Sequence, residues 1–229
     1  MVSDMPKVKT KKVSWEEVVK WSRGLAEKIK DSGWMPDIIV AISRGGYIPA
    51  RLLCDFLDIH DLVSVQILHW GKAAEITTKA HVKYPLKIDL SGRKVLLVDD
   101  ICDTGDSIMV AKDHILNECK PKEIRVAVMQ WISSIAKIRP DFYVEEVRNW
   151  IWYQYPWTRA EDTTNFFEKI LNEEAKEGKK EWTRDELIVR FKEWYGIDVG
   201  EEYYDIAIKR LVNSGILENR GNLLVYKRS

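Results

Sequence analysis

Hydrophobic and polar positions follow two different periods along the first two thirds of the chain. Apolar residues recur at helical spacing from Ser14 to Lys30, which predicts an amphipathic helix. The run from Asp37 to Ile42 is apolar without alternation, as in a strand buried on both faces. Further helices are predicted at 47–57 and 107–119, and further strands at 63–68, 94–98, 124–129 and 141–147. Because strands alternate with helices, the pattern indicates a parallel α/β fold.

Residues 70–92 interrupt this pattern. They mix Gly, Lys, Thr and His with little periodicity, so we predict a long mobile loop. A loop of this length in a compact domain usually has a function.

After Thr158 the pattern changes to three amphipathic segments, at 163–176, 183–195 and 201–214. Two short apolar segments flank Arg220, Gly221 and Asn222 and predict a hairpin. We therefore expect two domains, residues 1–160 and residues 161–229. The second has the elements of a three-helix bundle or of a winged helix, and the pattern leaves both open.

Composition narrows the class of protein. The 229 residues include 36 Lys and Arg against 36 Asp and Glu, so bulk charge gives no attraction to nucleic acid or to an anionic membrane. No apolar run approaches the ~20 residues of a membrane span. The three cysteines form no CxxC pair and fit a reducing compartment. We expect a globular protein of the cytoplasm.

The segment 95–107 (VLLVDDICDTGDS) carries the most informative chemistry. Its apolar residues end at Asp99 and Asp100, and a polar turn containing Gly105 then opens a helix. In an open parallel sheet, ligands bind beyond the carboxyl ends of the strands. Residues 103–107 would offer backbone N–H groups and two hydroxyls at a helix N-terminus, which suits a phosphate. The two carboxylates beside them suit sugar hydroxyls, so the segment predicts a site for a phosphorylated sugar.

Each of these polar residues also has a purely structural explanation. Asp99 and Asp100 would end the strand, and Asp106 or Ser107 would cap the helix. Five polar residues in this order after a buried strand favour the ligand site over that alternative.

The same segment resembles the phosphoribosylpyrophosphate (PRPP) signature of the type I phosphoribosyltransferases. Residues 39–50 (IVAISRGGYIPA) resemble the pyrophosphate loop and following helix of the purine salvage branch. Residues 141–144 (DFYV) and 152–157 (WYQYPW) are similar to the nucleobase hood of xanthine-guanine and hypoxanthine enzymes. The resemblance covers residues 14–158 and implies an α/β fold with a parallel sheet flanked by helices, plus a hood.

The resemblance implies a role for each residue of the PRPP segment. Asp99 and Asp100 would hold the ribose hydroxyls and lie near the Mg²⁺ that PRPP carries. The 5′-phosphate would lie in the loop of Asp103, Thr104, Gly105, Asp106 and Ser107. Asp103 would also act as general acid or base near purine N7. Thr158 stands where the related pattern has an acid for a second Mg²⁺, so Mg²⁺ is expected mainly through the substrate.

Pyrophosphate contacts are implied for the other loop. Ser43, Arg44 and Gly45 would bind pyrophosphate through backbone N–H groups, across a non-proline cis peptide bond. The loop at 70–92 would close over the reacting centre and exclude water from an oxocarbenium-like transition state. Its candidate pyrophosphate contact is Lys72, with Lys79 and Lys83 as further candidates.

The base pocket is where this sequence departs from the 6-oxopurine pattern. Trp152 would stack on the purine, with Trp150 as the alternative, and Tyr153 would offer backbone groups to the base edge. Gln130 stands where a lysine that donates to O6 is expected, and extra residues follow before Pro140. A glutamine carbonyl accepts from an exocyclic amine, which favours adenine. If Gln130 packs elsewhere, the inserted loop would supply another donor for a 6-oxopurine.

The predicted reaction is therefore adenine plus PRPP to AMP plus pyrophosphate, as in archaeal adenine phosphoribosyltransferases built on the xanthine-guanine plan. The alternative is a hypoxanthine, guanine or xanthine phosphoribosyltransferase. An alternative of another class is a PRPP-sensing transcription regulator that reads DNA through a C-terminal winged helix. Acids at Glu201, Glu202 and Asp205 oppose DNA binding, so no nucleic-acid partner is expected. The family resemblance implies a homodimer, and no membrane partner is expected.

Overall fold

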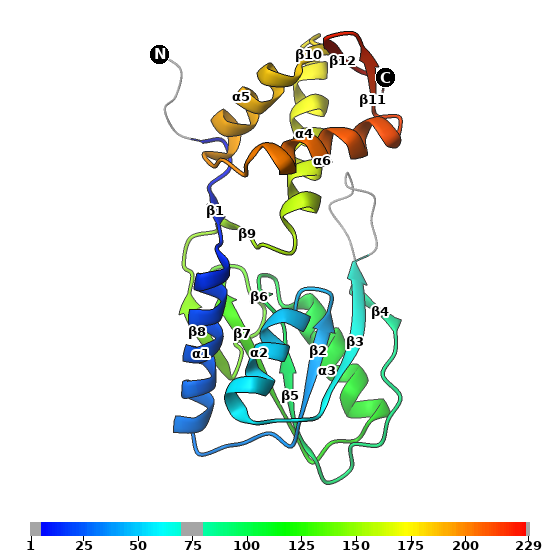
Figure 1. Cartoon of the computed structure of the whole chain (residues 1–229). Coiled ribbons are helices and arrows are strands. Elements are labelled where there is room, and N and C mark those ends of the chain that lie inside the picture. The colour runs from blue at the N-terminus through cyan, green and yellow to red at the C-terminus, as the bar shows by residue number, and fades with distance from the viewer. Residues whose placement is uncertain (1–5, 70–79, 228–229) are drawn as a thin grey trace. The chain divides into compact units, whose positions relative to one another are not determined.

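The computed structural model describes residues 6–69 and 80–227 (Figure 1). The chain divides into two compact units. The central unit is Trp15–Trp150, and the terminal unit joins Met1–Ser14 to Ile151–Ser229. Within the described residues, no helix has the length and apolar character needed to cross a membrane.

The central unit is built on a seven-stranded sheet. Its main path runs through β4 (Ala80–Tyr84), β3 (Leu62–His69), β2 (Ile38–Ser43), β5 (Lys94–Val98) and β7 (Glu123–Trp131). Two further strands pair with β7, namely β6 (Ile101–Cys102) and β8 (Phe142–Glu146). Each described pair is parallel except β3 with β4. The predicted parallel α/β fold is confirmed.

Helices cover both faces of this sheet. α1 (Trp15–Asp31) and α2 (Tyr47–Leu57) pack on the face that includes Ile39. α3 (Asp106–Glu118) packs on the opposite face, which includes Val40. Successive residues of a strand point to opposite faces, and every residue of β2 is buried. This is why β2 is apolar from Ile38 to Ile42 rather than alternating.

The terminal unit combines a short parallel strand pair with a helical domain. β1 (Thr10–Lys12) pairs with β9 (Trp152–Gln154). The helices are α4 (Arg159–Lys176), α5 (Arg184–Tyr195) and α6 (Glu201–Asn213). An antiparallel sheet follows the order β10 (Glu181–Thr183), β12 (Leu223–Tyr226) and β11 (Leu217–Arg220). Its core is largely aromatic and includes the buried side chains of Phe167, Trp182, Phe191, Tyr195 and Tyr204.

Part of the segment predicted to be a long loop is a strand. Residues 80–84 form β4, which pairs antiparallel with β3 at one edge of the central sheet. Burial falls along β4 from buried Ala80 to exposed Lys83 and Tyr84. An edge strand that is only partly buried has no continuous apolar pattern, so periodicity alone did not reveal it.

The division of the chain differs from the boundary expected after residue 160. Residues 151–160 join the terminal unit, because β9 pairs with β1 and Trp152 packs against the aromatic core. The Trp152 and Phe166 rings meet edge to face, with centroids 5.3 Å apart. Helix α4 begins at Arg159 rather than at 163. The three-stranded sheet is a feature that a plain three-helix bundle lacks.

Candidate active site

Two polar loops lie at the same edge of the central sheet. Strands β2 and β5 are parallel neighbours, with Ala41 paired to Val98. Their carboxyl ends therefore meet, and the loops 43–46 and 99–107 that follow them lie side by side. This edge is where ligands bind in open parallel sheets.

Two glycines allow the loops to approach each other. A Cβ on Gly45 would lie 2.7 Å from Asp100 Cγ, and a Cβ on Gly46 would lie 3.0 Å from Asp99 Cα. A side chain at either position would force a neighbour to move. The peptide bond between Ser43 and Arg44 is cis, as the family resemblance implies. Ser43 is buried and Arg44 is exposed.

Asp99 and Asp100 follow strand β5 as adjacent carboxylates. Asp99 Oδ1 accepts from the backbone N–H of Asp100 at 3.0 Å, and Asp100 Oδ1 accepts from the N–H of Ile101 at 2.9 Å. Burial, and then the charge of Asp100, raises the pKa of Asp99 well above its ordinary value. Such a pair gains from a ligand that donates hydrogen bonds or brings positive charge, which describes sugar hydroxyls and a Mg²⁺-bound substrate.

Residues 103–107 form the turn that leads into α3, and we call them the phosphate loop. Asp103 Oδ1 accepts from the N–H of Thr104 at 2.6 Å, and the Thr104 hydroxyl accepts from the N–H of Asp106 at 3.3 Å. Gly105, at φ +84°, is the N-cap of α3 and provides no capping side chain. A helix start of this kind favours an anion.

An inserted segment that the sequence did not explain covers the phosphate loop. Residues 132–140, which we call the cover loop, follow β7. The N–H of Lys137 donates to the Thr104 carbonyl at 2.9 Å, and Lys137 Nζ lies 2.7 Å from Asp106 Oδ1. Ile138 Cγ1 would lie 2.9 Å from a Cβ on Gly105. The sequence does show Lys137 among the extra residues before Pro140. Residue spacing alone does not show where such a loop folds, so its contact with the phosphate loop could not be predicted.

Gln130 is not presented to a ligand. Its side chain is fully buried, and Nε2 donates to Glu145 Oε2 at 3.3 Å. Glu145 lies opposite Gln130 on β8, and its other carboxylate oxygen accepts from Trp21 Nε1 at 3.1 Å. The carboxylate draws the amide toward β8. The structure therefore does not support the interpretation that Gln130 reads the base, and matches the alternative in which Gln130 packs elsewhere.

The aromatic residues expected at the base fall in different units. Trp152 and Tyr153 belong to β9 of the terminal unit, and Trp152 is half-buried against Phe166. Tyr153 lies near Lys11, whose Nζ is 5.9 Å from the ring centroid. Trp150 ends the central unit and is 44% exposed, so its ring has the larger accessible surface.

Of the three lysines expected to contact pyrophosphate, the structure describes one. Lys72 and Lys79 lie outside the described residues. Lys83 is exposed on β4, where Nζ lies 5.1 Å from the centroid of the Tyr84 ring.

Acidic and thiol side chains near these loops bear on metal binding and on nucleophilic chemistry. Among residues 6–69 and 80–227, no group of three or more His, Cys, Asp or Glu side chains is placed to hold a metal ion. Burial raises the pKa of the Cys102 thiol to about 12, so this cysteine offers no thiolate nucleophile. Asp99 and Asp100 offer the hard oxygen ligands that suit Mg²⁺ arriving with a phosphate substrate.

Comparisons with known proteins find relatives that align with the central unit and with the start of the terminal unit. Residues 13–158 match the phosphoribosyl transferase domain family. A xanthine-guanine phosphoribosyltransferase of Desulfotalea psychrophila is 31% identical over 151 residues, covering 65% of this chain and 86% of that protein. One from Cereibacter sphaeroides is 29% identical, covering 70% and 93%. The crystal structure of a purine phosphoribosyltransferase from Pyrococcus horikoshii is similar at TM-score 0.56 and 28% identity, covering 66% and 94%.

Proposed function

The chain belongs to the phosphoribosyl transferase family, and from this we propose that it transfers the 5-phosphoribosyl group of PRPP to N9 of a 6-oxopurine. The bond from ribose C1 to pyrophosphate breaks, a bond from C1 to N9 forms, and the base loses its N9 proton. The observation that carries the proposal is the close contact of loops 43–46 and 99–107 at the carboxyl edge of the sheet.

Two observations favour a 6-oxopurine over the adenine expected from Gln130. Similar proteins from Desulfotalea psychrophila and Cereibacter sphaeroides are named xanthine-guanine phosphoribosyltransferases. The Gln130 side chain is fully buried and its amide nitrogen donates to Glu145, so we infer that this residue does not read the base. Hypoxanthine, guanine and xanthine are therefore the proposed bases.

We assign the sugar and its phosphate to the loop after β5. Asp99 and Asp100 would accept hydrogen bonds from the ribose hydroxyls, and their buried charge would be relieved by that contact. The 5′-phosphate would bind at the start of α3, where the phosphate loop from Asp103 to Ser107 offers N–H groups and hydroxyls. Mg²⁺ bound to PRPP would reduce the repulsion between the diphosphate and these carboxylates.

We assign acid–base chemistry to Asp103. Its side chain is exposed at the mouth of the phosphate loop, while one carboxylate oxygen is held by the N–H of Thr104. The other oxygen would exchange a proton with the base as the bond to N9 forms. Ser43, Arg44 and Gly45 would bind the departing pyrophosphate beside Asp100.

The base itself would stack on an aromatic ring. Trp152 is the residue proposed from the sequence, with Tyr153 offering backbone groups to the base edge, and the exposed ring of Trp150 is the alternative. Stacking tolerates any purine, so it contributes affinity rather than selectivity.

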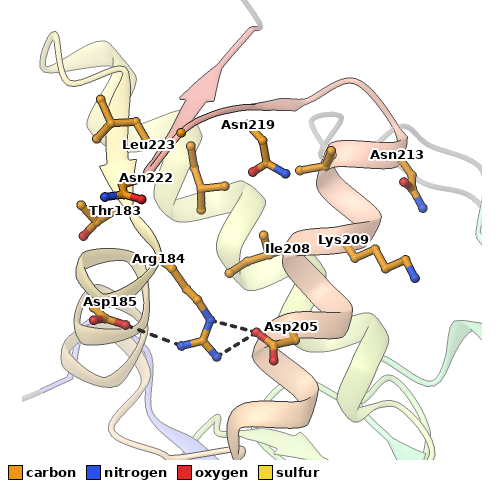
Figure 2. Close-up of a pocket in the computed structure, with 13 residues that line it drawn as sticks. Thr183, Arg184, Asp185, Asp205, Ile208, Lys209, Asn213, Asn219, Asn222 and Leu223 are labelled. Atoms are coloured by element: carbon orange, nitrogen blue, oxygen red, sulfur yellow. Dashed lines mark hydrogen bonds and ion pairs between the residues drawn. The ribbon is translucent and has the colours of Figure 1, made fainter.

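The terminal unit does not favour the regulator alternative. Its elements follow the winged-helix order α4, β10, α5, α6, β11, β12. DNA would meet the start of α6, which carries Glu201 and Glu202. A groove of about 730 Å³ lies between α5, α6 and the β11–β12 hairpin. Figure 2 shows Arg184 of this groove paired with Asp185 and Asp205. Since carboxylates repel the phosphate backbone, we propose that this unit does not read DNA.

A panel of bases tests the proposed function. The purified chain is incubated with Mg²⁺, PRPP and one of guanine, xanthine, hypoxanthine or adenine, and nucleotide is measured. We expect nucleotide from at least one 6-oxopurine at a rate well above that with adenine. Absence of nucleotide from every base would contradict the transferase proposal. A homodimer and a cytoplasmic location, which the resemblance implies, stay predictions.

A further inference from the structure

The phosphate loop is strongly acidic for a site that receives a phosphate. Residues 95–111 contain four aspartates and no lysine or arginine. Asp106 is the first residue of α3, directly after the Gly105 N-cap. A phosphate dianion arriving at this helix start would meet the Asp106 carboxylate at close range, where like charges repel strongly. A cation close to Asp106 would offset that charge.

Lys137 of the cover loop brings such a cation. Its Nζ lies 2.7 Å from Asp106 Oδ1, and its backbone N–H donates to the Thr104 carbonyl at 2.9 Å. The Lys137 side chain is 60% exposed and the Asp106 side chain 28%. The ammonium therefore lies at the phosphate loop and still has surface available to a ligand.

The cover loop is held in place at both sides of Lys137. Ile138 packs against Gly105, and its carbonyl accepts from Trp131 Nε1 at 3.1 Å. The Arg139 guanidinium lies 5.5 Å from the Trp131 ring centroid and donates to the Tyr143 hydroxyl at 3.1 Å. These contacts fix the backbone from which Lys137 reaches Asp106, which distinguishes it from an ordinary surface lysine.

We propose that Lys137 is a binding residue for the 5′-phosphate of the sugar substrate, with its ammonium bridging Asp106 and a phosphate oxygen. A lysine ammonium has three N–H donors, so it can hold the carboxylate and contact the phosphate together. Lys137 thus supplies from an inserted loop the positive charge that the phosphate loop lacks. The role rests on the proposed function, since it assumes that a phosphorylated sugar binds at residues 103–107.

The test compares Lys137→Ala and Lys137→Arg with Lys122→Ala. Lys122 is an exposed lysine just before β7, at the end of that strand opposite to the cover loop, so it serves as the matched control. Calorimetry measures the dissociation constants of ribose 5-phosphate and GMP, and kinetics measure KM for PRPP and for guanine. Thermal unfolding of each variant verifies that it folds.

In Lys137→Ala we expect the dissociation constants of ribose 5-phosphate and GMP, and KM for PRPP, to rise about tenfold, the size expected for one charge-assisted contact. KM for guanine should stay within about twofold, and Lys137→Arg should recover most of the loss because it keeps the charge. Lys122→Ala should match the wild type.

Unchanged phosphate affinity in a folded Lys137→Ala variant would overturn the proposal. A rise in KM for guanine alone would also overturn it, because Lys137 would then contact the base. If the wild type makes no nucleotide, the transferase proposal fails, while the ribose 5-phosphate arm still decides the role of Lys137.

Discussion

A Cβ on Gly45 would lie 2.7 Å from Asp100 Cγ, so the loop after β2 and the loop after β5 interlock at these two residues. One loop carries the proposed pyrophosphate contacts and the other carries the proposed ribose contacts. Their close approach would hold the ribose and the pyrophosphate of PRPP side by side. The absence of a side chain at Gly45 is therefore what lets the two loops lie this close together.

Gly45→Ala is expected to lower kcat/KM for PRPP on the order of 100-fold, because the methyl group displaces the Asp100 carboxylate or the whole loop. The matched control is Gly24→Ala in α1, where no atom lies within 4 Å of the added Cβ. The control should keep full activity and unfold at the same or a higher temperature, since alanine favours a helix. Steady-state kinetics at varied PRPP measure both. Equal activity of the two variants would show that the close contact is dispensable.

Asp103→Asn is expected to lower kcat about 100-fold or more while changing KM for PRPP by less than about threefold. The amide oxygen of Asn can still accept from the N–H of Thr104, so the loop keeps its shape. What is lost is the group that exchanges a proton with the base. Equal losses in kcat and in PRPP affinity would instead assign Asp103 to binding.

Asp99→Asn is expected to stabilise the unliganded protein at neutral pH. The pKa of Asp99 is raised in the folded state, by burial and then by Asp100, so the folded state binds its proton more tightly than the unfolded chain does. Stability is therefore lost as the pH rises above the pKa of an unfolded carboxyl and through the raised folded value.

The unfolding temperature of Asp99→Asn should exceed that of the wild type by about 2–4 °C at pH 7, the equivalent of about 1 kcal/mol. The difference should shrink as the pH falls toward about 4, because Asp99 is then protonated in the folded protein and, like asparagine, carries no charge. Calorimetric scans across this range measure it. A difference that does not change with pH would contradict the assignment, and PRPP binding should be weakened in the same variant.

Glu174→Ala is expected to destabilise the terminal unit by about 2–3 kcal/mol. The buried carboxylate accepts from Trp182 Nε1 at 2.8 Å and lies 3.2 Å from Arg190 Nε, so its removal leaves a buried indole N–H without that acceptor. The neighbouring Glu173→Ala is the control, because Glu173 makes a solvent-exposed pair with Lys176 and its replacement should leave the stability nearly unchanged. Urea unfolding followed by tryptophan fluorescence compares the two. Similar stabilities would contradict the role given to Glu174.

The fold of the central unit follows from patterns that the sequence displays openly. Strands β2 and β5 are buried on both faces and so carry unbroken apolar runs, 38–42 and 95–98. Helix α2 has the bounds predicted for it. The pairing of β1 with β9 could not be predicted, because Thr10–Lys12 is short and polar and its partner is far away in sequence. Such pairing depends on tertiary contacts that a local pattern does not contain.

The candidate site was predictable in its loops and not in its side-chain directions. The order of polar residues in 99–107 predicted a site for a sugar and a phosphate. The N–H groups at a helix start belong to the backbone, so this prediction did not depend on where any side chain points. The direction of Gln130 depended on Glu145, which lies beside it only because β7 and β8 pair in register. The position of Lys137 depended on the fold of an inserted loop.

A competition between guanine and adenine tests whether the chain transfers the phosphoribosyl group to a 6-oxopurine. The wild-type chain is mixed with Mg²⁺, limiting PRPP and equal amounts of guanine and adenine, and the nucleotides and pyrophosphate formed are separated and measured. We expect GMP and pyrophosphate in equal amounts, with little AMP. AMP as the main product would contradict the proposed base, and the absence of both nucleotides would contradict phosphoribosyl transfer to these purines.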